Sequence, residues 1–130
     1  MLYTTYFSQL DKIPQNAIKL VVTRYVPRDF NMLKYEKLHI VSDLGPSPTL
    51  LKQYNSTNKQ YDDWIKFKTS FINEINSRND IQHNINKIIK AITKGLDIYL
   101  ICYERNCNRC HRTILAEYIS NKTGYEWQEF

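Results

Sequence analysis

The sequence lacks the segments that would divide it or leave it unfolded. It has only three glycines and four prolines in 130 residues and no Gly/Ser-rich stretch, so we expect one domain over residues 1–130 with no flexible linker. Neither an internal repeat nor a low-complexity tract is present, which excludes a repeat architecture. A chain of this length can bury a hydrophobic core without disulfide bonds.

Long apolar runs are also missing. No stretch is long enough to cross a membrane, and residues 1–12 carry neither the basic start nor the apolar segment of a secretory signal. We therefore expect no membrane partner and a cytoplasmic location. Cysteine is scarce, with three copies, and in a reducing cytosol these are expected to be thiols, thiolates or ligands rather than a structural disulfide.

The excess of one charge is modest. The 18 basic and 13 acidic residues give a formal net charge of +5. This balance favours anionic partners such as nucleic acid, nucleotides or phosphates, although many unrelated proteins are equally basic. No dense run of Lys and Arg is present, so a disordered basic arm is not expected.

Strand and helix signals alternate along the chain. Strands are predicted at residues 2–7, 18–23, 38–44, 97–103 and 125–130. Helices are predicted from Pro48 with Ser47 as N-cap, over 61–75, from Asp80 as N-cap to Lys94 and Gly95, and over 110–121. This interleaving predicts an α/β protein with a largely parallel central sheet and flanking helices.

The chemistry concentrates in residues 102–111, which contain all three cysteines and one of the three histidines. A buried strand ends there, a short polar loop follows, and a helix begins at about Cys110. Strand ends that lead into helix N-termini are places where α/β proteins hold anions and reactive groups. The helix dipole, His111 and Arg112 would together lower the pKa of a Cys110 thiol in the first helical turn. The loop is therefore predicted to hold a thiolate, or to bind a phosphate or carboxylate.

Four interpretations of this loop compete. The first is an anion or nucleotide pocket with a functional thiol. The second is a zinc site formed by Cys102, Cys107, Cys110 and His111, whose residue types fit but whose spacing is poor, because adjacent Cys110 and His111 rarely reach one metal together. The third is haem attachment at the C-x-x-C-H sequence of 107–111, which requires an exported protein. The fourth is purely structural, with a buried strand-end cysteine and a helix start that only caps or bridges.

Residues 102–104 read Cys-Tyr-Glu, and residues 110–112 read Cys-His-Arg and run into Leu-Ala-Glu-Tyr at 115–118. This C-x-E and C-H-R pair resembles the C-terminal signature of the domain-of-unknown-function 488 family. The first strand at 3–7, Arg24 after the second strand and the aromatic helix beyond it resemble that family more weakly. The resemblance spans most of the chain and implies a fold and a set of site residues, but no reaction, because the family has no agreed activity. Cys107 lies outside the pattern, which weakens the zinc and haem interpretations.

Side chains at other strand ends are expected near the same loop. In a parallel sheet the carboxyl ends of the strands share one edge, which would bring Thr5, Tyr6 and Arg24 close to Cys102. Arg24 would then bind an anionic ligand, or alternatively form only a surface salt bridge. Glu104 would orient the neighbouring helix start or act as an acid or base, unless it is simply a solvated carboxylate.

Together these patterns predict a polar pocket for an anionic ligand, a nucleotide or a nucleic-acid component. The catalytic candidates are Cys102, Cys110, His111 and Glu104, and the ligand-binding candidates are Arg112, Arg24, Tyr6 and Thr5. His111 is expected to carry protons, because its ordinary pKa lies near neutrality. No cofactor and no metal are expected. The alternative is a non-catalytic module that binds nucleic acid or another protein, and the residues do not decide whether the chain is an enzyme.

Overall fold

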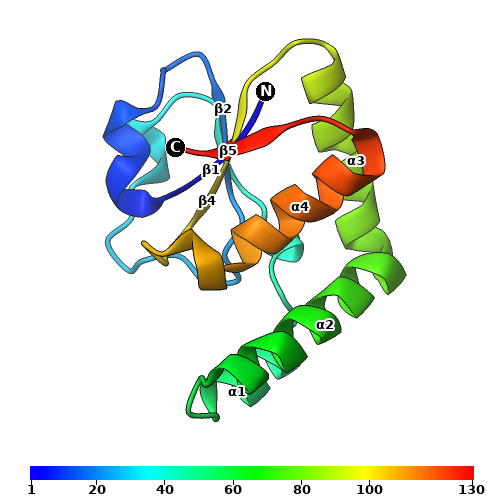
Figure 1. The fold of residues 1–130 in the computed structure, drawn as a ribbon. Coiled ribbons are helices and arrows are strands. Elements are labelled where there is room, and N and C mark those ends of the chain that lie inside the picture. The colour runs from blue at the N-terminus through cyan, green and yellow to red at the C-terminus, as the bar shows by residue number, and fades with distance from the viewer.

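Five parallel strands form the centre of the molecule (Figure 1). The computed structural model describes all of residues 1–130. The strands are β1 (Leu2–Tyr6), β2 (Ile18–Val21), β3 (Leu38–Ile40), β4 (Ile98–Cys102) and β5 (Trp127–Glu129), and their order in the sheet is β3-β2-β4-β1-β5. Every neighbouring pair is parallel, so the predicted α/β class with a parallel sheet is confirmed.

Four helices accompany the sheet, and their bounds are α1 (Pro48–Asn55), α2 (Tyr61–Ser77), α3 (Asn79–Thr93) and α4 (His111–Thr123). Helices α3 and α4 lie against the sheet, whereas α1 and the start of α2 form a hairpin that extends beyond it (Figure 1). Short 3-10 turns near the N-terminus pack on the opposite face of the sheet. No helix is both long enough and apolar enough to cross a membrane.

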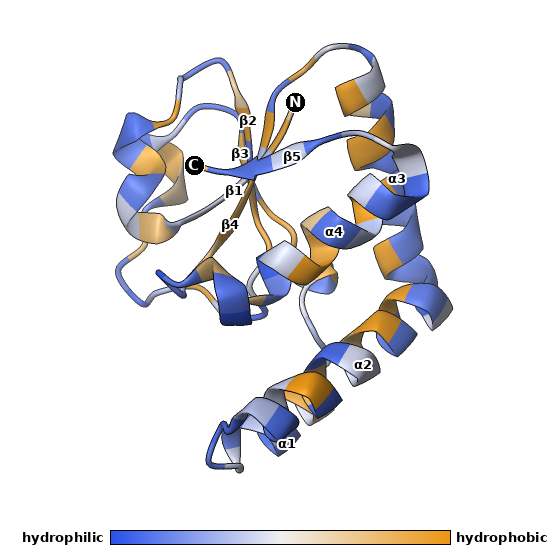
Figure 2. Ribbon diagram, in the orientation of Figure 1, coloured by the Kyte–Doolittle hydropathy of each residue, from blue (hydrophilic) through white to orange (hydrophobic).

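The hydrophobic core follows from the sequence periodicity. All five residues of β4, the middle strand, are buried, and Figure 2 shows hydrophobic residues concentrated on the central strands. The apolar stripe of α3 is buried at a spacing of three or four residues, at Ile81, Ile85, Ile88 and Ile92. Each fully buried aliphatic side chain of this size contributes about 1.5–3 kcal/mol, so this stripe stabilises the packing of α3 against the sheet.

Several predicted boundaries change for identifiable reasons. The predicted strand 38–44 ends at Ile40, and Ser42–Leu44 form a 3-10 turn that places Leu44 in the core. At this turn the backbone of Gly45 lies so close to the end of β2 that an added Cβ would meet main-chain atoms at 3.1 Å. Asp80 is not the N-cap of α3, because the helix begins at Asn79 and the Asp80 carboxylate pairs with Arg78. The predicted N-cap of α1 is confirmed, since the Ser47 hydroxyl accepts a hydrogen bond from the Leu50 N–H.

Candidate functional site

The two signature cysteines lie at the two ends of one short loop, which joins β4 to α4. Cys102 is the last residue of β4 and lies opposite Tyr6 of β1 in the sheet register. The loop 103–109 then leads to Cys110, which is the N-cap of α4 rather than a residue of its first turn. An N-cap lies directly above the free N–H groups of the helix start, so this correction keeps Cys110 within reach of the helix dipole.

Three side chains form what we call the thiol cluster: Cys102, Cys110 and His111. Their sulfur and ring nitrogen atoms all lie within 4.8 Å of one another. The Cys102 sulfur is 3.4 Å from Nδ1 and 3.2 Å from Nε2 of His111. Because these two distances are nearly equal, the sulfur packs against the imidazole ring as a whole rather than along the axis of one lone pair. Both cysteines are almost completely buried, with 1% and 3% exposure.

The protonation of His111 is fixed by a backbone contact. Its Nε2 lies 2.7 Å from the Val22 carbonyl oxygen, which can only accept, so Nε2 carries the hydrogen and Nδ1 is bare in the neutral ring. Burial lowers the pKa of His111 to about 4, and the nearby positive charge of Arg112 adds to this effect. The prediction that His111 carries protons because its pKa lies near neutrality is therefore corrected: the imidazole is neutral at physiological pH.

A pH-dependent stability follows from this burial. Between pH 6.5 and about 4, His111 is protonated in the unfolded chain but stays neutral in the folded chain. The free energy of unfolding therefore falls as the pH falls through this window. The full pKa difference corresponds to roughly 3 kcal/mol of stability that is lost at the acid end. Urea denaturation at several pH values should show a shallower acid slope for His111→Gln than for the wild-type chain. Equal slopes for the two proteins would contradict a neutral, buried imidazole.

The pKa values of the two thiols in the cluster are shifted in opposite directions. Burial raises the pKa of Cys102 well above its ordinary value. The pKa of Cys110 is lowered instead, first because the Cys102 thiol donates towards its sulfur, and then because the Arg112 guanidinium and backbone N–H favour the anion. These effects outweigh the burial of Cys110, which acts in the other direction. The first proton therefore leaves Cys110, while Cys102 keeps its proton and stabilises the thiolate.

Arg112 is fully buried and is held entirely by protein groups. Its guanidinium donates to both carboxylate oxygens of Glu129, at 3.2 and 2.9 Å, and to the carbonyl oxygens of Glu104 and Arg105. The predicted role of Arg112 as a ligand holder does not fit this geometry. Instead, Arg112 ties β5 and the loop 103–109 to α4 and places a fixed positive charge beside Cys110.

Glu129 is the partner that the sequence analysis missed. It lies on β5, and its carboxylate also accepts a hydrogen bond from Thr4 of β1. The alternating pattern of residues 125–130 indicates a strand, but it does not say that this strand joins the sheet beside β1. Only the observed pairing of β1 with β5 brings the Glu129 carboxylate under the helix start.

Three further predicted site residues are Tyr6, Arg24 and Thr5, and each makes different contacts. Tyr6 lies beside Cys102, with the Arg105 guanidinium 5.9 Å from the centre of its ring. Arg24 donates to the carbonyl oxygens of Pro46 and Gly45, so in this structure it holds the turn before α1. Thr5 is buried, and its hydroxyl lies 3.4 Å from the Phe130 carbonyl oxygen.

Glu104 contacts the site residues only through its backbone. Its carbonyl oxygen accepts from Arg112, whereas the residue itself is exposed on the loop. No ion pair or hydrogen bond of its carboxylate with His111 or Arg112 is present. The simpler expectation, a solvated carboxylate, matches this placement.

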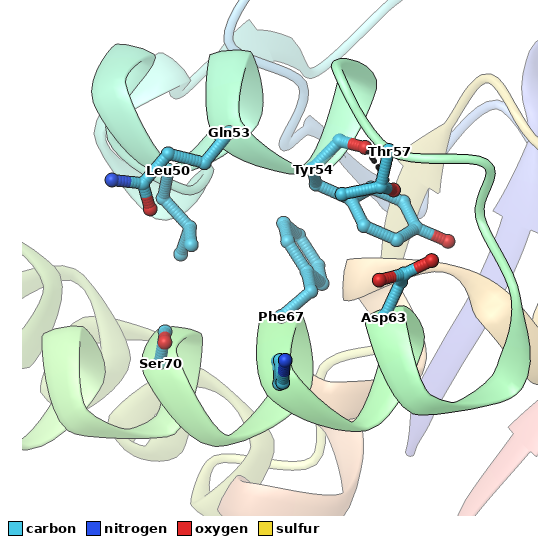
Figure 3. Close-up of a pocket in the computed structure, with 8 residues that line it drawn as sticks. Leu50, Gln53, Tyr54, Thr57, Asp63, Phe67 and Ser70 are labelled. Atoms are coloured by element: carbon cyan, nitrogen blue, oxygen red, sulfur yellow. Dashed lines mark hydrogen bonds between the residues drawn. The ribbon is translucent and has the colours of Figure 1, made fainter.

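The two sulfurs of the thiol cluster do not face an open pocket, because Cys102 is only 1% and Cys110 only 3% exposed. Four cavities of the molecule are lined by residues outside the thiol cluster. One of them, of about 140 Å³, lies between α1 and α2 and contains Tyr54 and Phe67 (Figure 3). Another, of about 420 Å³, lies between the β2–β3 edge and α3. The two sulfurs are instead enclosed in the protein at either end of the loop 103–109.

The geometry of the thiol cluster argues against the zinc and haem interpretations. Its two sulfurs and one imidazole are near enough to hold a cation, but zinc sites normally use four ligands. Cys107, the fourth predicted ligand, lies outside the cluster. The positive charge of buried Arg112 also opposes a cation at this place. Haem attachment does not fit, because it needs an accessible Cys110 and this sulfur is buried.

The fold and the site define a class: a parallel-sheet α/β protein with a buried thiol pair at the carboxyl edge of its sheet. A family model described as the active DUF488-N3 subclade matches residues 3–123, which is nearly the whole chain. The protein therefore belongs to the domain-of-unknown-function 488 family, as its resemblance implied. Neither a curated protein nor a solved structure matches it.

Proposed function

We propose that this protein binds an anionic ligand, a nucleotide or a nucleic-acid component, at the carboxyl edge of its sheet, with Cys110 as the reactive thiolate. The observation that carries the proposal is the place of Cys110 in the fold, at the N-cap of α4 and next to the buried Arg112. Cys110 sits at a helix N-cap beside a buried guanidinium, while Cys102 remains protonated against it. Helix N-termini and neighbouring cations are two of the features that activate cysteine nucleophiles in proteins.

Exposed side chains at the same edge support an anionic ligand. The loops that follow β2 and β4 carry Arg28, Arg105 and Arg109, all exposed. Arg109 donates to the Lys59 carbonyl oxygen at 3.1 Å, so the turn between α1 and α2 adds its own lysine to this surface. Guanidinium groups bind phosphates through two parallel hydrogen bonds, which makes a phosphate-bearing ligand the best match to these loops.

Two exposed tyrosines at this edge favour a nucleotide over a simple phosphate. Tyr25 follows β2 and is 65% exposed, and Tyr103 follows β4 and is 47% exposed. Tyrosine rings at such positions offer faces on which nucleobases stack, and each stacked base contributes about 1–3 kcal/mol. Arginines for the phosphate and tyrosines for the base together fit a nucleotide or a short single strand.

Chemistry at Cys110 requires a movement of the loop 103–109, because the sulfur is only 3% exposed. The loop is held by Arg112, which donates to two of its carbonyl groups, and by the Thr113 hydroxyl, which donates to the Cys107 carbonyl oxygen. Ligand contacts with Arg105 and Arg109 would act directly on this loop. Binding and exposure of the thiolate are therefore expected to be coupled.

Thermal-shift measurements over a panel of nucleotides and short single-stranded oligonucleotides test the proposal. The wild-type chain and the matched control Cys107→Ser are expected to be stabilised by one ligand class, by about 2.7 kcal/mol at a ligand concentration of 100 times Kd. The double variant Cys102→Ser/Cys110→Ser should lose most of this shift. Unchanged shifts in the double variant would remove the thiols from the site, and no shift with any ligand would contradict the ligand class.

The alternative, a non-catalytic binding module, is favoured by the net charge of +5 and by the same exposed tyrosines. It predicts a steep loss of DNA or RNA affinity with salt, because bound phosphates release counterions. The two functions separate in the Cys102→Ser/Cys110→Ser variant. Binding that keeps its affinity and its salt slope in that variant supports the module.

A further inference from the structure

The two buried thiols stand in the relationship that disulfide chemistry needs. Their sulfur atoms lie within 4.8 Å of each other, one at a strand end and one at a helix N-cap. Cys107, although it lies between them in sequence, is outside the cluster and is more exposed. The fold thus pairs two of the three cysteines. The third, Cys107, serves as an internal control for a thiol outside the pair.

We infer that Cys102 and Cys110 form a redox-active pair, in which a hydroperoxide oxidises Cys110 and Cys102 then closes an intramolecular disulfide. This inference rests on the proposed function only through the reactive Cys110, and it requires no nucleotide. It assigns Cys102 a separate role, as the resolving thiol. It also makes the pair a site of reversible oxidation that controls whether the Cys110 thiolate is available.

The chemistry balances in two steps. The Cys110 thiolate attacks one peroxide oxygen, the O–O bond breaks, and the products are a Cys110 sulfenic acid and an alkoxide or hydroxide. The Cys102 sulfur then attacks the Cys110 sulfur and displaces the sulfenic hydroxyl, which leaves as water with the Cys102 proton. The pair loses two electrons, and the peroxide, as the oxidant, gains them.

The structure supports this order of events. Cys110 has the lowered pKa and is therefore the thiol that reacts first, while Cys102 keeps the proton that the second step consumes. The sulfurs must approach to about 2.05 Å to form the bond. Cys110 has extended backbone angles and precedes the first helical residue, so its side chain can rotate towards Cys102 without unwinding α4. Burial of both sulfurs favours a small oxidant such as hydrogen peroxide over a bulky disulfide.

The test treats the folded full chain with hydrogen peroxide, blocks the remaining thiols in denaturant, and maps the peptides by mass spectrometry. We expect one intramolecular disulfide between Cys102 and Cys110, a mass loss of two hydrogen atoms, and Cys107 as the only thiol left to be blocked. Cys107→Ser should form the same disulfide. Cys102→Ser should stop at a Cys110 sulfenic acid, which dimedone traps.

Each other result decides against the inference in a distinguishable way. A disulfide that includes Cys107, or a Cys110 that passes to sulfinic acid in the wild-type chain, overturns the pair but leaves Cys110 as the reactive thiol of the proposed function. A Cys110 that peroxide leaves unmodified overturns the pair and the reactivity of Cys110 together. Because the wild-type chain gives the primary result, the test does not depend on any variant folding.

Discussion

Replacing Arg112 by methionine is expected to lower the free energy of unfolding by about 3–5 kcal/mol, the cost of breaking a buried ion pair by removing one partner. Arg112 is fully buried and bonded to Glu129 and to two loop carbonyl groups. Methionine fills a similar volume but donates nothing, so the Glu129 carboxylate loses its partner. Urea denaturation measures the loss directly, and thermal unfolding should shift down by roughly 10–20 °C.

The matched control for this prediction is Glu129→Gln. Glutamine keeps an acceptor for Arg112, and the Glu129 side chain is 27% exposed, so its replacement should cost less than the loss of Arg112. The order of the two variants tests the assignment of Arg112 as the structural tie between β5, the loop 103–109 and α4. A stability of Arg112→Met within about 1 kcal/mol of wild type would contradict that assignment.

Replacing Phe71 by alanine is expected to cost about 3–5 kcal/mol, because the side chain is completely buried and leaves a cavity. Phe71 lies on α2, and its ring meets His111 edge-on, with the ring centres 5.9 Å apart. The cavity would therefore open beside the thiol cluster. Urea denaturation measures the stability, and NMR titration of the His111 ring measures its pKa.

The pKa of His111 distinguishes this prediction from an ordinary core defect. If burial is what holds that pKa at about 4, water entering the cavity of Phe71→Ala should raise it towards 6.5. Phe71→Leu keeps most of the apolar volume and should change both quantities less. If Phe71→Ala loses stability while the pKa of His111 stays unchanged, the packing of α2 does not control that pKa, and the prediction is contradicted.

The fold was largely predictable from local patterns. The apolar stripe of α3 and the Ser47-Pro48 helix start carry their signals within a few residues, and the structure confirms both. The strand predicted over 38–44 failed at the point where a long-range contact takes over, since Leu44 is drawn into the core and Gly45 packs on β2. Local propensity cannot anticipate a contact that depends on a distant strand.

The site was predictable in its members but not in its environment. The C-x-E and C-H-R signature identified Cys102, Cys110 and His111, which the structure brings together. Sequence spacing could not show that these groups are buried, so the neutral state of His111 was not anticipated. It also could not show that Glu129 comes from β5 to neutralise Arg112, because that pairing depends on the strand order of the sheet.

The reactivity assigned to Cys110 is tested most directly by the pH dependence of its alkylation by iodoacetamide in the Cys107→Ser chain, followed by peptide mapping. Because only the thiolate reacts, the midpoint of the rate profile reports the pKa of the site. We expect a midpoint for Cys110 below that of an ordinary cysteine, with Cys102 unreactive over the same range. A Cys110 midpoint at or above the ordinary value, or preferential labelling of Cys102, would contradict this expectation.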